Sequence, residues 1–134
     1  MDRVLDRLWI GSSRDAAAPL KSLGFAAVLD LRDDAGAIAQ PSSVVVHRVK
    51  NRDGDPWACG QVVEALDFIA DQVRGGRVLV LCAAGMSRSA CMVVGYLVRA
   101  GFDEASAYEL LRRARPRVAP VERMLDSVLA AVRA

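Results

Sequence analysis

Histidine and cysteine are scarce in this chain of 134 residues. It contains one histidine, His47, and three cysteines that stand far apart without a Cys-x-x-Cys pair. A structural zinc site or a disulfide framework needs more of these residues at closer spacing, so the sequence argues against both. We therefore expect a reduced, cytoplasmic protein that uses neither a metal ion nor another cofactor.

Long apolar runs and a large net charge are also absent. The longest largely apolar stretch without charge covers residues 78–87, far short of the ~20 residues that a membrane-spanning helix needs. Residues 1–7 alternate charged and apolar side chains and lack the apolar core of a signal peptide. The net charge of +2 gives no reason to expect nucleic acid or a membrane as a partner, and we expect a monomer.

What is present is an ordinary globular composition, with 53% hydrophobic and 25% charged residues. At roughly 100–200 residues per domain, the length allows one domain over residues 1–134. Short apolar runs bounded by turn residues predict strands at residues 7–10, 25–31, 44–49 and 77–81. Capping residues and helical spacing predict helices at residues 12–23, 57–73, 87–100 and 103–113, and a last helix that opens at Pro120. This alternation indicates a single α/β domain, with a central, mainly parallel sheet of about four or five strands flanked by helices.

The most informative segment follows the strand at residues 77–81. Cys82 ends this strand, and Arg88 follows a loop of small residues at the point where a helix begins. Such a loop turns successive backbone N–H groups inward at a helix N-terminus, where they bind anions. The planar guanidinium of Arg88 matches two phosphate oxygens, and the same donors favour the nucleophilic thiolate of Cys82. The predicted phosphate-binding residues are Ala83, Ala84, Gly85, Met86, Ser87 and Arg88.

This segment and its flanks resemble the dual-specificity phosphatases of the cysteine-dependent protein tyrosine phosphatase superfamily. The family's signature is His-Cys, five residues, Arg, then Ser or Thr, and Cys82, Arg88 and Ser89 match it. The resemblance extends over nearly the whole chain, with residues 8–12 and 23–31 similar to the family's first strands. It implies a metal-independent phosphatase that acts on phosphotyrosine and phosphoserine/threonine in proteins through a cysteinyl-phosphate intermediate. It also implies that the Ser89 hydroxyl assists breakdown of that intermediate.

The leaving oxygen needs a proton, which a carboxylic acid on a second loop can supply. The family takes this aspartate from the loop before the long helix that precedes the cysteine strand, and here that loop holds Asp53 and Asp55. Counting back from Phe68, whose surroundings resemble the family's helix, Asp53 is nearer to the family position. We expect Asp53 to be the general acid, and Asp55 remains the alternative.

One residue departs from the signature, because Leu81 stands where the family usually has histidine. His47 lies on another strand, and we expect it to be structural. The departure predicts a slower enzyme with a less acidic Cys82 but not an inactive one. Two alternatives stay open, a phosphoinositide or RNA 5′-phosphate phosphatase on the same scaffold and a phosphate-binding pseudophosphatase. The absence of Lys and Arg from residues 83–87 argues against polyanionic substrates.

Other polar residues receive structural interpretations. The arginine-rich run at residues 112–117 is typical of a solvated helix end and suits the helix dipole, in preference to a substrate-docking patch. Cys91 lies in an apolar stretch and is predicted to belong to the core, whereas Ser87 is predicted to be only a loop or cap residue. Cys59, close to the candidate acid loop, is expected to be a free thiol and not the partner of Cys82 in a disulfide.

Overall fold

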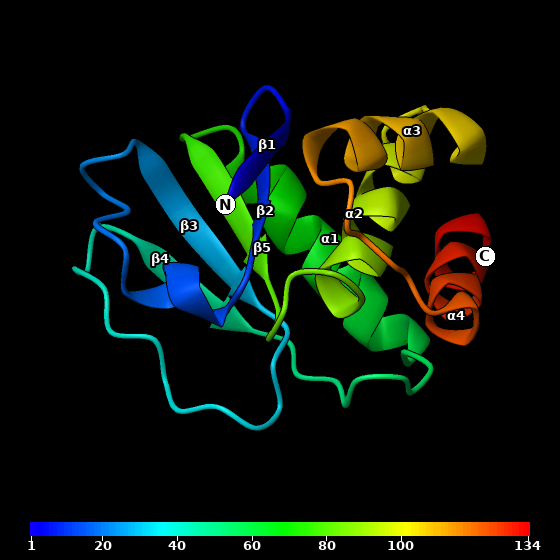
Figure 1. The fold of residues 1–134 in the computed structure, drawn as a ribbon, viewed down its shortest axis with the longest axis horizontal. Helices are drawn as coiled ribbons and strands as arrows, with labels where there is room; N and C mark the ends of the chain where they lie inside the picture. The colour runs from blue at the N-terminus through cyan, green and yellow to red at the C-terminus, as the bar shows by residue number, and fades with distance from the viewer.

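Five strands form one sheet, in the order β1-β2-β5-β3-β4, in the computed structural model, which describes residues 1–134 (Figure 1). The strands are β1 (Asp2–Leu5), β2 (Leu8–Gly11), β3 (Phe25–Asp30), β4 (Val45–Arg48) and β5 (Arg77–Leu81). Neighbouring strands pair in parallel, except for the antiparallel pair of β1 and β2. The predicted α/β domain with a mainly parallel sheet is confirmed.

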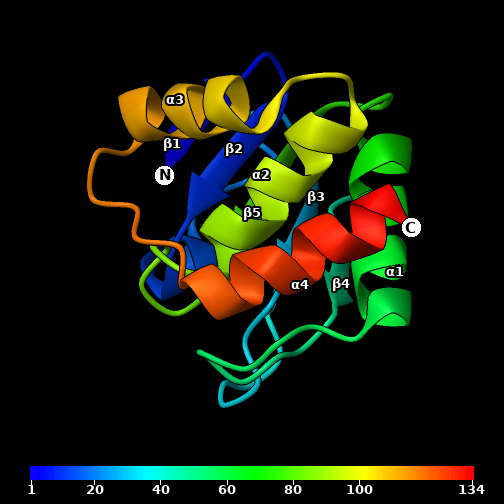
Figure 2. The ribbon, with the colours of Figure 1, turned by 90° about the vertical axis from the view of Figure 1, so that its right-hand side faces the viewer.

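Four α-helices cover one face of this sheet, as Figure 2 shows. They are α1 (Cys59–Gln72), α2 (Arg88–Arg99), α3 (Glu104–Ala114) and α4 (Glu122–Arg133). Helix α2 packs on β5 and β2, α1 packs on β3 and β5, and α4 lies across α1 and α2. No helix has both the length and the apolar character that crossing a bilayer requires.

The apolar run of β5 is explained by its central position between two hydrophobic clusters. Val78 and Val80 point into the larger cluster beneath the α-helices, whereas Leu79 and Leu81 point into a smaller one on the opposite face. All four side chains are fully buried. Because successive strand residues face opposite sides, a strand that is covered on both faces must be apolar throughout.

The N-terminal part of the chain differs from the prediction in two respects. The helix predicted at residues 12–23 is only a short 3-10 helix, η1 (Ser13–Ala17), followed by turns. Proline disfavours the helical conformation in the residue before it, and Ala18, which precedes Pro19, is extended with φ −65° and ψ 156°. Strand β1 was not predicted, because its two charged residues followed by two apolar ones lack the strict alternation that indicates a strand, and only Val4 is buried.

The parallel strands bring three loops together at their carboxyl ends, in the lower part of Figure 1. These loops follow β3, β4 and β5. The backbone N–H of Leu31, just after β3, donates to the carbonyl of Leu81 at 3.0 Å, so the ends of β3 and β5 are directly joined. Ligands of open α/β sheets bind at this edge, which is where the sequence places its candidate residues.

Candidate functional site

The loop between β5 and α2 turns its carbonyl oxygens outward. Ser13 donates its backbone N–H to the Ala83 carbonyl at 3.0 Å, and Ala119 donates to the Met86 carbonyl at 2.8 Å. The backbone N–H groups of residues 83–87, by contrast, donate to no other group of the protein. Neighbouring N–H groups without acceptors at a helix N-terminus form a concave site for an anion. The predicted phosphate-binding loop therefore has the geometry that such binding needs.

Gly85 is required in this loop for both its backbone angle and its surroundings. Its φ is +68°, and a Cβ atom would lie 2.5 Å from the Gly11 carbonyl oxygen and 2.8 Å from Nη2 of Arg115. That same Nη2 donates to the Ala84 carbonyl at 3.3 Å, while Nη1 of Arg115 binds the Asp2 carboxylate at 2.8 Å. Any larger residue at position 85 would displace the backbone that forms the loop.

Cys82 lies at the base of the loop and is almost fully buried, with 2% of its surface exposed. Its Sγ is 3.2 Å from the hydroxyl oxygen of Ser89, and it accepts a hydrogen bond from the backbone N–H of Ser89 at 3.4 Å. Ser89 is itself fully buried in the first turn of α2. The structure therefore brings together the cysteine and the serine that the signature predicts.

Arg88, the first residue of α2, is held by only one of its nitrogens. Nη1 donates to the backbone carbonyl of Asn51 at 2.9 Å and to the carboxylate of Asp33 at 3.1 Å. Nε is buried and has no partner within the protein. A buried donor without an acceptor is rare, and an oxyanion would satisfy it. The guanidinium is therefore positioned by two loops and retains a donor for a ligand.

Asp33 lies in the loop after β3, and its contact with Arg88 was not predicted from the sequence. This loop depends on Asp30, a buried carboxylate at the end of β3 that accepts hydrogen bonds from Arg32 at 2.8 Å and from Arg48 at 2.6 Å. Arg48 also donates to two backbone carbonyls of the loop, at residues 35 and 36. A charged residue at the end of an otherwise apolar strand was the sequence signal for this network.

The charge state of Asp30 follows from these contacts. Burial alone would raise its pKa, but the hydrogen bonds from Arg32 and Arg48 outweigh burial and hold the pKa below its usual value. The ionised carboxylate therefore stabilises the folded state at neutral pH. Its contribution is present above the ordinary aspartate pKa of about 3.9 and disappears as the pH falls through the lower folded-state value.

We expect Asp30→Asn to lower the free energy of unfolding by about 3 kcal/mol at pH 7, because the change leaves two arginines without their buried counter-charge. Urea denaturation measures this difference, which should shrink as the pH falls below about 4, because the Asp30 carboxylate of the unfolded chain binds a proton at a higher pH than that of the folded protein. Asp67→Asn is the matched control, since Asp67 pairs with Arg99 on the surface and should contribute at most about 1 kcal/mol. Equal effects of the two substitutions would contradict the assignment.

Both candidate acids lie in the loop between β4 and α1, and both are exposed. Burial raises the pKa of the Cys91 thiol to about 12, and the negative charges of Cys82 and Asp53 add to that rise. The choice of Asp53 over Asp55 rests on the sequence, in which Asp53 is nearer to the family position.

Neither Leu81 nor His47 donates a hydrogen bond to the phosphate-binding loop. Leu81 is fully buried in the smaller hydrophobic cluster, on the face of the sheet opposite the α-helices. His47 lies on β4, where Nε2 is 2.9 Å from a carboxylate oxygen of Glu64 and the ring stacks on Phe68 at 5.1 Å. No three His, Cys, Asp or Glu side chains gather closely enough to hold a metal ion.

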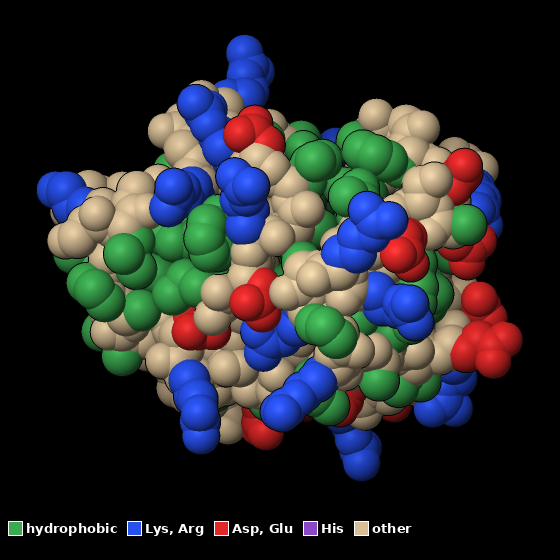
Figure 3. Space-filling model, turned by 45° about the horizontal axis from the view of Figure 1, so that its top comes forward, with side chains coloured by type: hydrophobic (Ala, Val, Ile, Leu, Met, Phe, Trp, Pro, Cys, Tyr) green, Lys and Arg blue, Asp and Glu red, His purple; other side chains and the backbone are tan.

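The arginine-rich run divides into two parts. Arg112 and Arg113 are exposed and pair with Glu109, as expected for a solvated helix end. Arg115 and Arg117, in contrast, line a hollow of about 330 Å³ beside the loop, together with Met86. On the face that Figure 3 shows, Lys and Arg side chains lie among Asp and Glu and do not form one continuous basic patch.

The two remaining cysteines differ in exposure. Cys91 is fully buried in the larger hydrophobic cluster, as predicted for a core residue. Cys59 is exposed at the start of α1, and its thiol is free. The Ser87 hydroxyl is buried without a partner and does not cap α2.

Comparisons with known proteins are consistent with this geometry. Residues 8–133 match the family model described as dual specificity phosphatase, catalytic domain. Dual specificity protein phosphatase 1 of Homo sapiens is 32% identical over 128 residues, which cover 87% of this chain and 33% of that protein. Dual specificity protein phosphatase 1-A of Xenopus laevis is 33% identical with the same coverage. The chain thus spans about a third of the length of these relatives.

Solved structures share the fold over almost the entire chain. Human DUSP28 superimposes with a TM-score of 0.90 at 26% identity, covering 99% of this chain and 96% of that one. A mouse putative dual specificity phosphatase complexed with zinc tungstate gives 0.89 at 26% identity, with coverage of 98% and 86%. PTPMT1 in complex with PI(5)P gives 0.80 at 17% identity, with coverage of 98% and 93%, a likeness of fold alone.

Proposed function

This chain belongs to the dual specificity phosphatase catalytic-domain family, and from that premise we propose that it hydrolyses phosphotyrosine and phosphoserine/threonine in proteins. The observation that carries the proposal is the set of donors around Cys82. The Ser89 N–H points at the sulfur, the N–H groups of residues 83–87 have no acceptor, and the buried Nε of Arg88 has none either. A phosphate dianion supplies acceptors for these groups directly above a nucleophile.

The reaction proceeds in two steps. The Cys82 thiolate attacks phosphorus, an S–P bond forms as the P–O bond to the leaving group breaks, and Asp53 gives its proton to the departing oxygen. Water then attacks the cysteinyl phosphate, its proton passes to Asp53, and the S–P bond breaks to release inorganic phosphate. The Ser89 hydroxyl, 3.2 Å from Sγ, donates to the departing thiolate in this second step.

Arg88 and the loop amides stabilise the phosphoryl group in both steps. Charge accumulates on the equatorial oxygens during the transfer, and donors that are already oriented need not reorganise when it does. Arg88 is oriented before substrate binds by its contacts to Asp33 and Asn51. Leu81 donates no hydrogen bond to this loop, so we expect slower turnover than in relatives with histidine at that position. We still expect activity, because the nucleophile, the general acid and the donors to phosphate are all present.

The first test is hydrolysis of a fluorogenic aryl phosphate by the purified protein in the presence of EDTA. We expect turnover that EDTA does not reduce, because every proposed step uses side chains of the chain itself. A panel of phosphotyrosine, phosphoserine and phosphothreonine peptides then defines the protein substrates. Absence of hydrolysis together with tight binding of inorganic phosphate would identify a phosphate-binding pseudophosphatase instead.

Phosphoinositide hydrolysis is the second candidate. Arg115 and Arg117 beside the loop can contact a second anionic group, and the PTPMT1 neighbour is complexed with PI(5)P. Against this, residues 83–87 include no basic side chain that could bind the additional phosphates of a phosphoinositide. We therefore favour protein substrates, and short-chain phosphoinositides in the same panel decide between the two. Faster hydrolysis of phosphoinositides than of any phosphopeptide would reverse this preference.

A further inference from the structure

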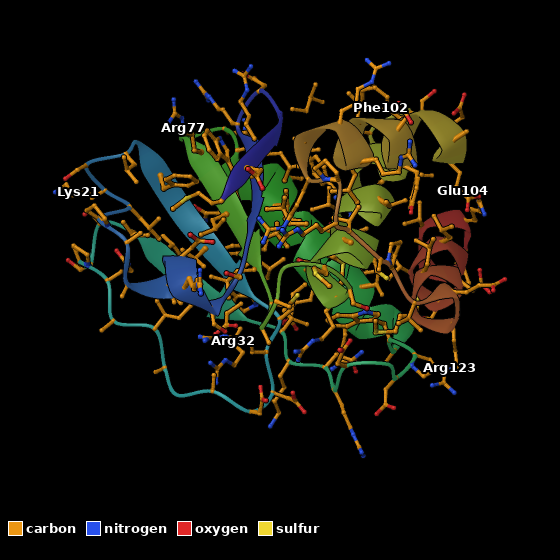
Figure 4. All side chains as sticks on the ribbon, in the orientation of Figure 1. Lys21, Arg32, Arg77, Phe102, Glu104 and Arg123 are labelled. Atoms are coloured by element: carbon orange, nitrogen blue, oxygen red, sulfur yellow. The ribbon has the colours of Figure 1, made fainter.

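Helix α4 makes specific polar contacts with the loop that carries the proposed general acid. Arg123, in its first turn, donates from both Nε and Nη2 to the Gly54 carbonyl, at 3.1 and 2.8 Å. The Gly54 N–H in turn donates to Sδ of Met124 at 3.2 Å. In Figure 4 the Arg123 side chain lies beside this loop. Both backbone polar groups of Gly54, which stands between the two candidate aspartates, are thus bound by α4.

The end of the loop is held by the same helix. The Trp57 N–H donates to the Ser127 hydroxyl at 2.8 Å, and that hydroxyl donates to the Met124 carbonyl at 2.6 Å. The Trp57 side chain is 4% exposed and belongs to the larger hydrophobic cluster. The boundary between the loop and α1 is therefore held by contacts with α4.

The start of the loop is joined to the phosphate-binding site. Asn51 accepts from Arg88 through its carbonyl at 2.9 Å, and its side chain donates to the Asp55 carbonyl at 2.8 Å. Asp53 therefore lies between a point fixed by Arg88 and a point fixed by Arg123. Gly54 has a φ of +94°, a backbone conformation that glycine adopts without strain.

We propose that Arg123 is a positioning residue that orients Asp53 toward the leaving oxygen by binding the Gly54 carbonyl. The inference rests on the proposed function, because it concerns the acid of that reaction. Arg123 itself is exposed and acts only through the loop backbone. Both hydrogen bonds to the Gly54 carbonyl come from a positively charged guanidinium, which makes them stronger than hydrogen bonds between neutral groups. No other side chain binds the Gly54 carbonyl.

Arg123→Met tests the proposal, because methionine keeps the unbranched apolar stem and the high helix propensity of arginine but removes both hydrogen-bond donors. We expect kcat to fall roughly three- to tenfold with phenyl phosphate, a part of the ~10² that a general acid contributes. The KM should change little. With a substrate whose leaving group is a strongly acidic phenol, kcat should fall less, because that leaving group needs no proton.

The same substitution is then made in the Asp53→Asn protein, where no proton can be delivered. If Arg123 acts through Asp53, Arg123→Met has no further effect in that background. Arg123→Lys should recover part of the loss, since lysine retains a positive donor but not the paired geometry. The control is Arg133→Met on the same helix, which removes only a surface pair with Glu104 and should leave kcat unchanged.

The outcomes separate positioning from general stabilisation of the fold. Thermal unfolding of each variant shows whether the protein remains folded at the assay temperature. Equal losses with both leaving groups, losses that add to that of Asp53→Asn, or no loss at all would overturn the proposal. An inactive wild type would instead refute the proposed function. In that case the hydrogen-bond contact is tested alone, by the shift of the Gly54 amide in NMR spectra of the Arg123→Met protein.

Discussion

Replacing Cys82 with serine should abolish phosphatase activity and leave the oxyanion site intact. The serine hydroxyl is not ionised at neutral pH, so no nucleophile is present, and we expect kcat to fall at least ~10⁴-fold. The substitution changes one buried atom and leaves the loop N–H groups and Arg88 in place. Turnover of an aryl phosphate and calorimetric binding of tungstate measure the two properties separately.

Cys59→Ser is the matched control for this experiment. Cys59 has an exposed, free thiol at the start of α1, so the same chemical change there should leave kcat within about twofold. A Cys82→Ser protein that retains one per cent of wild-type activity or more would contradict the assignment of the nucleophile. Loss of both activity and tungstate binding would indicate instead that the loop had changed its conformation.

The second large effect is expected at the general acid. Asp53→Asn keeps the shape of the side chain and removes its proton, so kcat with phenyl phosphate or a phosphotyrosine peptide should fall about 10²-fold or more. Substrates with strongly acidic leaving groups should be affected much less. Single-turnover and steady-state kinetics across a series of substituted phenyl phosphates measure this dependence.

Asp55→Asn serves as the comparison, because Asp55 lies two positions away in the same loop and is also exposed. We expect it to reduce kcat less than tenfold, by changing the turn and not the proton transfer. A larger loss for Asp55→Asn than for Asp53→Asn would assign the acid to Asp55. That result would also remove the basis for the role proposed for Arg123.

Much of this site could be predicted from sequence because its parts are contiguous. The strand at residues 77–81, the loop and the start of α2 follow one another directly, and local rules for apolar runs and helix N-termini apply to each. The boundaries of the four predicted strands agree with the structure to within two residues, whereas β1 was not predicted. Family resemblance supplied the role of Ser89, which no local rule implies.

The parts that were missed depend on contacts between distant segments. Asp33 is an ordinary loop residue until β3 and β5 pair side by side, and only then does its carboxylate meet Arg88, which lies far from it in the sequence. Arg123 likewise reads as an exposed helix residue until α4 lies over α1 and α2. Such pairings arise from the packing of complete elements, which periodicity and composition do not encode.

The hydrogen bonds to the loop carbonyls link catalysis to the cooperativity of folding. Ser13 lies before β3 and Ala119 lies between α3 and α4, yet both bind the short loop after β5. Detachment of either segment would allow the loop peptides to rotate, and the array of inward N–H groups would be lost. A partly unfolded form that keeps the central strands but releases the segment before α4 would thus be unable to hold a phosphoryl group. The geometry of the anion-binding loop therefore depends on two segments that lie outside the strand, loop and helix that carry it.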